Sequence, residues 1–435
     1  MTQEPASRRR RRLTATVTDL EVGIQRAFLV GVELPGMSSV DAERSLVELA
    51  LLTDTAGSEP VDQELVRRTR LDPATYIGSG KAEELATLTK ALDIDLVVFD
   101  NQLTPAQQRN LQKLFGCDVV DREGVILDIF AQHAHTRVGA LQVELALHRY
   151  NLPRLRGKGK SLSQQGAGVL ARGPGETKLE TDRRRILQRI SKLERELKDT
   201  ARHRETQRKA RRRTEIPQVS IVGYTNAAKS TLLNAMTDAG VLVEDRLFAT
   251  LDSTVRRLDL PNHRAVLLAD TVGFVRRLPH HLVDAFQSTL SEVAEADLLV
   301  HVVDGTDADP AGQIAAVREV LLEIGAADIP ELIVFNKADA MSEHASRRLS
   351  NLYPESVVIS ALNGIGLEGL LERIGDLVER TMVTLTLEIP YSRGDVVAAA
   401  HRVGEVIEEK HDDQGMIVEV RVPETTRGLF SEFSR

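Results

Sequence analysis

Short apolar runs alternate with amphipathic stretches in the first part of the chain. The runs predict strands at 27–34, near 60–67, at 94–100 and over CDVVD. The amphipathic stretches predict helices over SVDAERSLVELALLTDTAG, with Ser39 as a possible N-cap, over 81–92, and over TPAQQRNLQKLFG. Because strands that alternate with helices form parallel sheets, we expect an N-terminal parallel α/β domain at 21–125.

The Gly-rich stretch YIGSGK in this domain resembles a phosphate loop, but its spacing is wrong. Thr75 stands where the first glycine is needed, and Ala82 follows Lys81 where a serine or threonine is needed. We therefore interpret the stretch as a turn.

Apolar residues then recur at spacings of three and four in two segments. The first segment contains Leu127, Ala131, Ala134, Val138, Leu141, Leu145, His148 and Leu152. The second contains Leu179, Ile186, Ile190, Leu193 and Leu197, with a gap at Arg183. Such a seam is typical of a coiled coil. We expect an antiparallel helical hairpin at 126–214, with a Gly-rich tip loop at 153–177.

Strong alternation of strands and helices returns at 215–383. The runs QVSIVG, AVLLAD, DLLVHVVD, ELIVFN and SVVIS predict buried strands, and open α/β sheets bind ligands at the carboxyl ends of such strands. Residues 384–435 show an alternating strand, a short helix, two strands (GEVIEE and MIVEVRV) and a last helix, which predict a small C-terminal α+β module.

Four motifs follow these strands in order. The first is an expected phosphate loop made of Gly223, Tyr224, Thr225, Asn226, Ala227, Ala228, Lys229, Ser230 and Thr231. Its backbone N–H groups and the following helix N-terminus suit a phosphate. Lys229 would contact the β- and γ-phosphates, and Ser230 would bind Mg²⁺. In the second motif, DTVGF, Asp270 would complete the Mg²⁺ site and the Gly273 N–H would meet the γ-phosphate.

The other two motifs suit a guanine base. In NKAD, Asp339 can accept hydrogen bonds from guanine N1–H and N2–H, a donor pair that adenine lacks. Asn336 would meet the base edge, and Lys337 would lie along the base. In the SAL motif of Ser360, Ala361 and Leu362, the Ala361 N–H would bind guanine O6. Together, the four motifs predict a P-loop GTPase domain.

One residue departs from the phosphate-loop pattern, because Ala228 stands where glycine precedes the lysine. If the position requires a left-handed backbone, alanine costs about 1–2 kcal/mol. That cost corresponds to an affinity about five- to thirtyfold weaker. We therefore expect a real but weakened nucleotide site.

Composition narrows the class of protein. The chain has 435 residues, of which 42% are hydrophobic, 28% charged and 3% aromatic, so it can form several packed domains but offers few aromatic surfaces for single-stranded nucleic acid. Its single cysteine excludes an internal disulfide and fits a reducing cytoplasm. No apolar run is long enough to span a membrane.

Charge is distributed unevenly along the chain. Residues 151–214 carry 20 Lys and Arg against 7 Asp and Glu, in a chain whose net charge is −8. A basic segment in an acidic protein suggests a face that binds a polyanion such as RNA. Residues 1–20 include a run of five arginines and read as a disordered basic arm, either a solvated tail or an RNA contact.

At this point the sequence resembles the HflX family of ribosome-associated GTPases over nearly its whole length. The stretches that carry the resemblance include ATYIGSGKAEEL, LQVELALHRYNLPRLRG, ARGPGETKLETDRRRI, IVGYTNAAKSTLLNA, DRLFATLDSTVRRL and DTVGFVRRLPHHLVDAFQSTL. The resemblance implies an N-terminal α/β domain, a helical hairpin, a Ras-like GTPase domain, and binding of the hairpin to the large ribosomal subunit, with its loop near the peptidyl-transferase region of 23S rRNA.

The resemblance also implies roles for further residues. LFATLD provides Phe248 beside the nucleotide and Thr250 as the threonine that senses Mg²⁺ and the γ-phosphate, with Thr254 as the alternative. Lys229, Thr250 and Gly273 are then the catalytic groups, and Ser230, Thr250 and Asp270 the metal ligands. Asn226 matches an asparagine that binds K⁺ in related GTPases. Phe274 stands where Ras-like enzymes place a water-orienting glutamine, so slow intrinsic hydrolysis is expected.

The sequence thus predicts a cytoplasmic GTPase that binds GTP or GDP with Mg²⁺, acts on the large ribosomal subunit, splits or rescues stalled ribosomes, and is monomeric off the ribosome. Two alternatives remain open. One is an rRNA-binding factor whose hydrolysis is impaired by Ala228, and the other is an ATP-dependent RNA remodeller.

Overall fold

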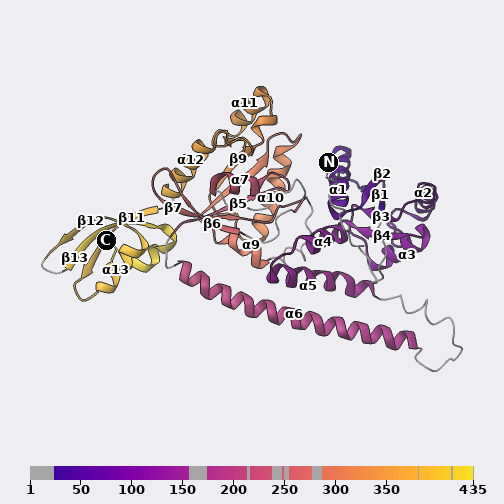
Figure 1. Ribbon diagram of the computed structural model, residues 1–435, viewed down its shortest axis with the longest axis horizontal. Coiled ribbons are helices and arrows are strands. Elements are labelled where there is room, and N and C mark those ends of the chain that lie inside the picture. Colours follow the sequence, from indigo (N-terminus) through magenta and orange to yellow (C-terminus); the bar gives the residue numbers. More distant parts are fainter. Residues whose placement is uncertain are drawn as a thin grey trace, which may run out of the picture. The chain divides into compact units, whose positions relative to one another are not determined.

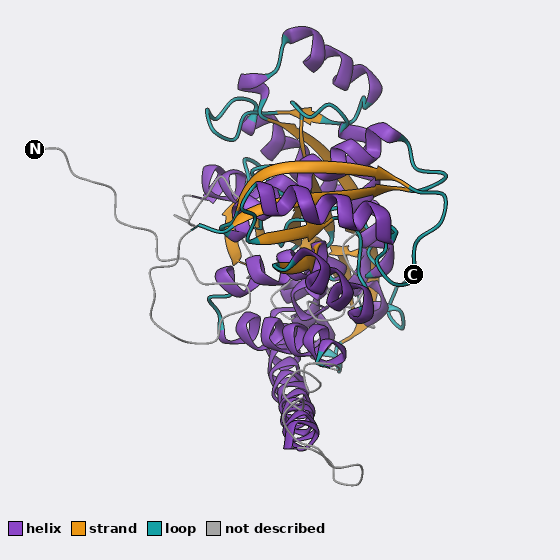
Figure 2. Ribbon diagram, turned by 90° about the vertical axis from the view of Figure 1, so that its right-hand side faces the viewer, coloured by secondary structure: helices purple, strands orange, loops and turns teal. Residues whose placement is uncertain are grey.

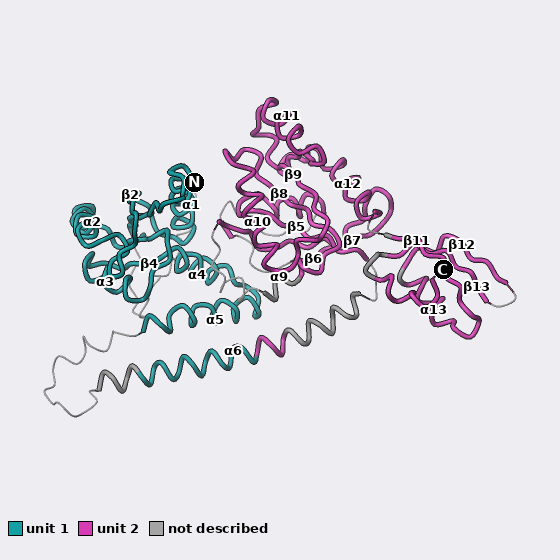
Figure 3. Tube along the Cα trace, turned by 180° about the vertical axis from the view of Figure 1, so that it is seen from behind, with its two compact units in different colours: residues 1–195, 278–285 teal, residues 196–277, 286–435 magenta. Residues whose placement is uncertain are grey.

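The computed structural model describes residues 24–155, 174–212, 216–237, 247–248, 254–276, 287–380, 382–412 and 415–434. The basic arm predicted at 1–20 and most of the tip loop predicted at 153–177 lie outside these residues. The chain divides into two compact units (Figure 3), one running to Arg195 and one comprising nearly all of the chain from Glu196 on. The described residues form both helices and strands (Figure 2). These elements alternate through much of the chain.

The first unit is built on a four-stranded sheet in the order β2-β1-β3-β4. Its strands are β1 (Arg26–Glu33), β2 (Glu59–Arg67), β3 (Leu96–Phe99) and β4 (Asp118–Asp121). All three pairings are parallel. Side chains on both faces of β1 and β3 are buried, as is typical of a parallel sheet covered by helices. The predicted parallel α/β domain is confirmed.

Four helices connect and follow these strands (Figure 1), namely α1 (Ser39–Ala56), α2 (Ser79–Ala91), α3 (Pro105–Phe115) and α4 (Arg122–His133). The N-cap of α1 is Ser38, whose hydroxyl accepts a hydrogen bond from the Asp41 N–H, and Ser39 is the first helical residue. The prediction of Ser39 was wrong by one position. Adjacent serines suit the cap equally by residue type, and the extended backbone at Ser38 decides between them.

The stretch YIGSGK forms the turn into α2, as interpreted from its spacing. The Lys81 ammonium lies 2.8 Å from carboxylate oxygens of both Glu64 and Glu84. Two carboxylates therefore neutralise this lysine within the protein, unlike the lysine of a phosphate loop.

The long apolar seam predicted across 127–152 is not one continuous helix. Helix α4 ends at His133, and Thr136 caps a new helix, α5 (Arg137–Arg154), by accepting a hydrogen bond from the Gly139 N–H. Ala131 is exposed, and α5 instead buries Gly139, Gln142, Val143, Leu145, Ala146 and Tyr150. The domain boundary predicted at 125/126 also falls inside α4, whose buried apolar residues pack in the first unit.

The second helix of the predicted hairpin is α6 (Pro174–Arg212), which doubles back past α5 in Figure 1. Two ion pairs join the helices, Arg189 with Glu144 at 2.6 Å and Arg149 with Glu194 at 2.8 Å. Over 180–200, only Ile190 and Leu193 of α6 are buried. This contact is therefore more polar than the predicted coiled-coil seam.

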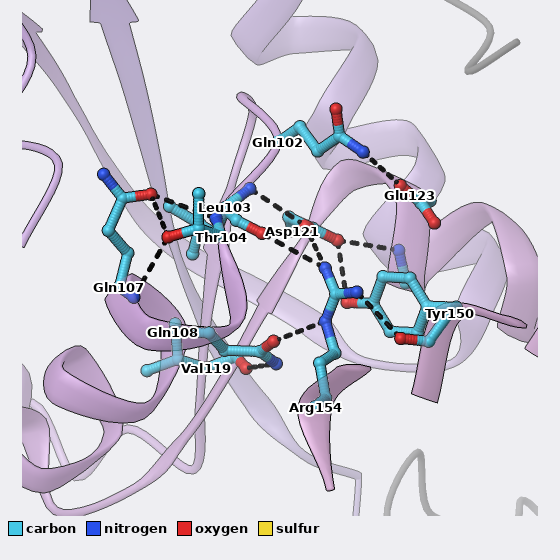
Figure 4. Close-up of polar contacts among 11 residues, drawn as sticks. Gln102, Leu103, Thr104, Gln107, Gln108, Val119, Asp121, Glu123, Tyr150 and Arg154 are labelled. Atoms are coloured by element: carbon cyan, nitrogen blue, oxygen red, sulfur yellow. Dashed lines mark hydrogen bonds and ion pairs between the residues drawn. The ribbon is translucent and has the colours of Figure 1, made fainter. Parts of the chain in front are cut away.

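The last turn of α5 is fastened to the sheet through Arg154 (Figure 4). Its guanidinium lies 3.1 Å from the buried carboxylate of Asp121 at the end of β4, donates to Gln108 Oε1 at 2.7 Å, and stacks 3.5 Å from the centre of the Tyr150 ring. Asp121 also accepts hydrogen bonds from the Tyr150 hydroxyl and from the Leu103 and Gly124 N–H groups. The start of the predicted tip loop is thus held by the α/β domain.

The second unit contains a six-stranded sheet in the order β10-β9-β8-β5-β7-β6. Its strands are β5 (Gln218–Gly223), β6 (Thr254–Asp259), β7 (Ala265–Asp270), β8 (Leu298–Asp304), β9 (Glu331–Asn336) and β10 (Val357–Val358). Its helices include α7 (Lys229–Thr237), α9 (Gln287–Ala294), α10 (Pro310–Glu323), α11 (Glu343–Leu352) and α12 (Leu367–Arg380). All five predicted strands are present. The edge strand β6, which pairs antiparallel with β7, was not predicted.

A three-stranded antiparallel sheet in the order β11-β13-β12 completes this unit. Its elements are β11 (Met382–Pro390), α13 (Gly394–Val403), β12 (Glu405–His411), β13 (Gly415–Pro423) and a 3₁₀ segment, Glu424–Phe430, in place of the predicted last helix. The boundary predicted at 383/384 falls inside β11. Within the part of the chain that the structure describes, no helix has the length and apolarity needed to cross a membrane.

Candidate functional site

The phosphate loop connects the end of β5 to the start of α7, in the centre of the six-stranded sheet. Gly223 closes β5 with φ of 152°, and a Cβ built there would lie 2.1 Å from the Val302 carbonyl oxygen of β8. No side chain fits so close to a neighbouring strand. The loop can therefore begin its turn only because this residue is glycine.

Ala228 has a left-handed backbone, with φ of 63°. A left-handed conformation costs an L-residue with a Cβ about 1–2 kcal/mol. Ala228 therefore carries the strain that was predicted for a left-handed backbone at this position. The Ala228 carbonyl accepts the first hydrogen bond of α7, from the Leu232 N–H at 3.0 Å, so this strained residue also starts the helix.

Lys229 is buried, and its ammonium donates to the Tyr224 carbonyl at 2.9 Å. Burial lowers the pKa of Lys229 to about 8, opposed by the nearby Asp270 carboxylate. Because burial removes water from the Lys229 ammonium, a bound anion would compensate for the lost hydration.

Ser230 lies in the first turn of α7 and Asp270 ends β7, and the two side chains meet directly. The Ser230 hydroxyl donates to Asp270 Oδ2 at 2.6 Å, and Asp270 Oδ1 accepts from the Thr271 N–H at 3.0 Å. Asp270 is fully buried, so its carboxylate orientation is fixed. A hydroxyl and a carboxylate oxygen at one point form a donor set that suits Mg²⁺, which commonly takes few protein ligands and completes its shell with phosphates and water.

Gly273 lies against the phosphate loop. A Cβ at this position would be 3.0 Å from Lys229 Nζ and 2.8 Å from Thr225 Cγ2. The next residue, Phe274, is 1% exposed, and its backbone pairs with the loop, because the Thr225 N–H donates to Phe274 O at 2.7 Å and the Phe274 N–H to Gly223 O at 3.1 Å. The ring at 274 is therefore packed in the interior.

Asn336 joins the base motif to the phosphate loop. Its Nδ2 donates to the Ala227 carbonyl at 3.0 Å, and its Oδ1 accepts from the Ala361 N–H at 2.9 Å. The Ala361 N–H thus donates to Asn336 in this structure, and its predicted contact with guanine O6 stays a prediction. A primary amide carries two N–H groups, and the predicted contact of Asn336 with the base edge would use the second one.

The other base-motif residues lie beside Asn336. Asp339 is exposed, and its Oδ1 accepts a hydrogen bond from the Ser360 hydroxyl at 2.5 Å. The Lys337 ammonium lies 2.7 Å from Asp304 Oδ2, and Lys337 has a left-handed φ of 67°. Leu362 of the SAL motif is 76% exposed. Strands β8 and β9 thus present Asp304, Asn336 and the following turn at one edge.

Two predicted site residues come from the LFATLD stretch. Thr250 lies outside the described residues, so its role stays a prediction. Phe248 is described and is 2% exposed, with φ of 57°. Thr254, the predicted alternative to Thr250, is the first residue of β6.

Sequence reasoning missed the links that hold this site together. Asn336 and Ala227 are 109 residues apart, and no local pattern indicates their hydrogen bond. The Tyr224 hydroxyl accepts a hydrogen bond from the Arg276 N–H at 2.7 Å, a contact equally hidden in the sequence. Only the strand order, which brings the ends of β5, β7 and β9 together, could have suggested either.

Three protein-family models match the chain. They are described as GTP-binding GTPase N-terminal (residues 43–131), GTP-binding GTPase Middle Region (133–211) and 50S ribosome-binding GTPase (218–337). The GTPase HflX of Caldanaerobacter subterraneus subsp. tengcongensis is 46% identical over 398 residues, which cover 92% of this chain and 91% of that protein. The chain belongs to the HflX family of GTPases. The GTPase HflX of Escherichia coli is 42% identical over 381 residues, 87% of this chain and 89% of its own.

Among solved structures, a GTP-binding protein from Sulfolobus solfataricus in complex with GDP is 26% identical, with a TM-score of 0.42, over 81% of this chain and 98% of that one. A complex of SsGBP with GDP is 28% identical, with a TM-score of 0.45 and the same coverage. As a member of the HflX family, this chain is a GTPase whose domain at 218–337 binds GTP and GDP.

Proposed function

We propose that this HflX-family GTPase uses the GTP-bound state to bind the large ribosomal subunit, and that it splits or rescues stalled ribosomes. The observation that carries the proposal is the convergence, in one domain, of a phosphate loop, a Ser230–Asp270 pair and a base motif tied to that loop through Asn336. The family model over this domain describes a 50S ribosome-binding GTPase, which supports the choice of partner.

In this proposal each group has one task. The Lys229 ammonium binds the β- and γ-phosphates, and the Gly273 N–H binds the γ-phosphate alone. Asp339 accepts hydrogen bonds from guanine N1–H and N2–H, and its exposure leaves it open to a base. Adenine offers no matching donor pair, so the carboxylate would lose its partners with ATP.

The residues present fit a magnesium ion. Ser230 and Asp270 would hold it, with Thr250 added on the strength of the family resemblance, and it would neutralise charge on the phosphates. Asn226 is exposed with φ of 60°, and we propose it as the K⁺ ligand. Its replacement by alanine should remove any dependence of hydrolysis on K⁺ over Na⁺.

Intrinsic hydrolysis should be slow. Phe274 is buried and carries no polar group, so this position cannot orient the attacking water as a glutamine does. The large subunit would then supply the missing catalytic geometry. Hydrolysis would remove the γ-phosphate contact at Gly273 and release the ribosome.

The basic segment 151–214 is the proposed contact with 23S rRNA near the peptidyl-transferase region. In the described part of α6, Arg184, Arg185, Lys192, Arg195 and Lys198 are exposed. Exposed cations along a helix favour phosphate contacts, whose strength falls steeply with salt. Arg154 would fix the base of the loop that inserts.

GTPase activity measured with and without large ribosomal subunits tests the proposal. We expect a clear rise in turnover on adding large subunits, and much less on adding small ones. A single-turnover assay distinguishes the alternative of a hydrolysis-impaired rRNA-binding factor, in which subunits bind but GTP stays intact. Competition of ATP against labelled GDP tests the ATP-driven remodeller, which requires ATP to compete efficiently.

A further inference from the structure

Residues 274–276 are joined to the phosphate loop by three hydrogen bonds. Two are between backbone groups, from the Thr225 N–H to Phe274 O and from the Phe274 N–H to Gly223 O. The third runs from the Arg276 N–H to the Tyr224 hydroxyl at 2.7 Å. Only the third involves a side chain of the loop, so it alone can be removed by a conservative substitution.

The Tyr224 side chain that forms this hydrogen bond is buried, and the partner residue, Arg276, is held by a further contact. Tyr224 is 8% exposed. The guanidinium of its partner, Arg276, lies 2.7 Å from Asp309 Oδ2, and Asp309 caps α10 by accepting from the Gly312 N–H at 3.0 Å. Arg276 is therefore fixed through its backbone to the phosphate loop and through its side chain to a helix N-terminus.

Gly273 lies immediately before this fastened segment and against Lys229. A Cβ at 273 would be 3.0 Å from Lys229 Nζ, so the glycine backbone and the ammonium border the same small space. A γ-phosphate bound between them would sense the position of Gly273, whereas GDP has no group there. Any contact that fixes Gly273 should therefore act on GTP and leave GDP almost unchanged.

We propose that Tyr224 is a positioning residue for GTP selectivity. Its hydroxyl holds the Arg276 backbone, and through residues 274–276 it keeps Gly273 in place beside Lys229 before the nucleotide binds. Preorganisation of this kind lowers the cost of positioning Gly273 when the γ-phosphate arrives. The inference rests on the assignment of the phosphate site in the proposed function, but it requires no ribosome.

The test compares Tyr224→Phe with wild type in the full-length protein, by titration with fluorescent GDP and with a fluorescent non-hydrolysable GTP analogue. The expected result is a loss of affinity for the analogue of about two- to twelvefold, the value for one neutral hydrogen bond, with GDP affinity changed less than about twofold. Tyr353→Phe is the matched control, because Tyr353 packs on Phe335 in the same unit, and it should change neither affinity.

A purely structural role for Tyr224 would weaken GDP and the analogue equally, and that result overturns the inference. Unchanged affinities, or tighter binding of the analogue, overturn it as well. Failure of the wild-type protein to bind either nucleotide would count against the proposed function itself, so the two failures are distinguishable.

Discussion

Asn336 donates a hydrogen bond from its Nδ2 to the Ala227 carbonyl across 3.0 Å, and one side chain thereby connects the base motif to the phosphate loop. The same side chain accepts from the Ala361 N–H. Asn336 is 1% exposed, so its loss would leave two backbone groups without partners in a buried place.

We expect Asn336→Ala to weaken GDP and GTP binding to a similar extent. Each unpaired buried group costs about 1–3 kcal/mol, which corresponds to an affinity at least tenfold lower if the loop has to be reordered on binding. Fluorescent-nucleotide titration measures the change. Asn363→Ala, in an exposed turn nearby, serves as the control and should bind as wild type does. An unchanged affinity for Asn336→Ala would contradict the assigned role.

Ala228→Gly should stabilise the protein and tighten nucleotide binding. Removing the Cβ relieves about 1–2 kcal/mol of left-handed strain, offset by about 0.5–1 kcal/mol for the greater freedom of glycine in the unfolded chain. Because the left-handed φ at Ala228 belongs to the folded loop, the relief should also raise the melting temperature measured without nucleotide. Tighter GDP binding should come from the space freed beside the phosphate. Equal GDP affinity for wild type and Ala228→Gly would refute the prediction of tighter binding.

Lys229 predicts a pH dependence of binding. Burial lowers its pKa to about 8, below the usual lysine value of about 10.4. Between these values the folded protein holds fewer protons than the unfolded chain, so the free energy of unfolding should rise with pH. Nucleotide binding requires the charged ammonium and should weaken over the same range. GDP titrations from about pH 7 to 9.5 would show this slope, and Lys229→Met should bind weakly with a flatter slope. Equal dependence of GDP affinity on pH in wild type and Lys229→Met would contradict the prediction.

Removing the Arg154 side chain should destabilise the first unit. Arg154→Ala leaves the fully buried Asp121 carboxylate without its cationic partner, a loss typically of about 3–5 kcal/mol in buried pairs. Arg149→Ala breaks a pair whose side chains are 40% and 46% exposed and should cost under about 1 kcal/mol. Urea unfolding monitored on both variants compares them. Similar midpoints for the two would show that Arg154 does not hold the end of α5.

Most parallel strands of the two larger sheets were predictable because they are short apolar runs ended by polar residues. Strand β6 was missed because it lies at the sheet edge, where Arg256 and Arg257 are exposed and the apolar signal is weak. The seam across 127–152 misled because its spacing continues through the break at Ala134, and the local signal, Thr136 three residues before Gly139, was overlooked. Burial against the α/β domain, which periodicity alone does not reveal, then selected a different face of α5.

Site chemistry was predictable where a motif is local. Lys229 with Ser230, and Asp270 with Gly273, each lie within four positions of one another, so their spacing carries the signal. The contacts that fix the site are long-range, as between Tyr224 and Arg276 or between Asn336 and Ala227. They depend on which strands are neighbours. The sequence predicted strain at Ala228 only if its backbone is left-handed. The backbone φ in the structure shows that it is.

The most direct test of the central claim is co-sedimentation of the protein with large ribosomal subunits in the presence of a non-hydrolysable GTP analogue, GDP or no nucleotide, at fixed salt. The account predicts strong association with the analogue and weak association in the other two conditions, because only the analogue carries the γ-phosphate that the Gly273 N–H would contact. Equal sedimentation in all three conditions would contradict it.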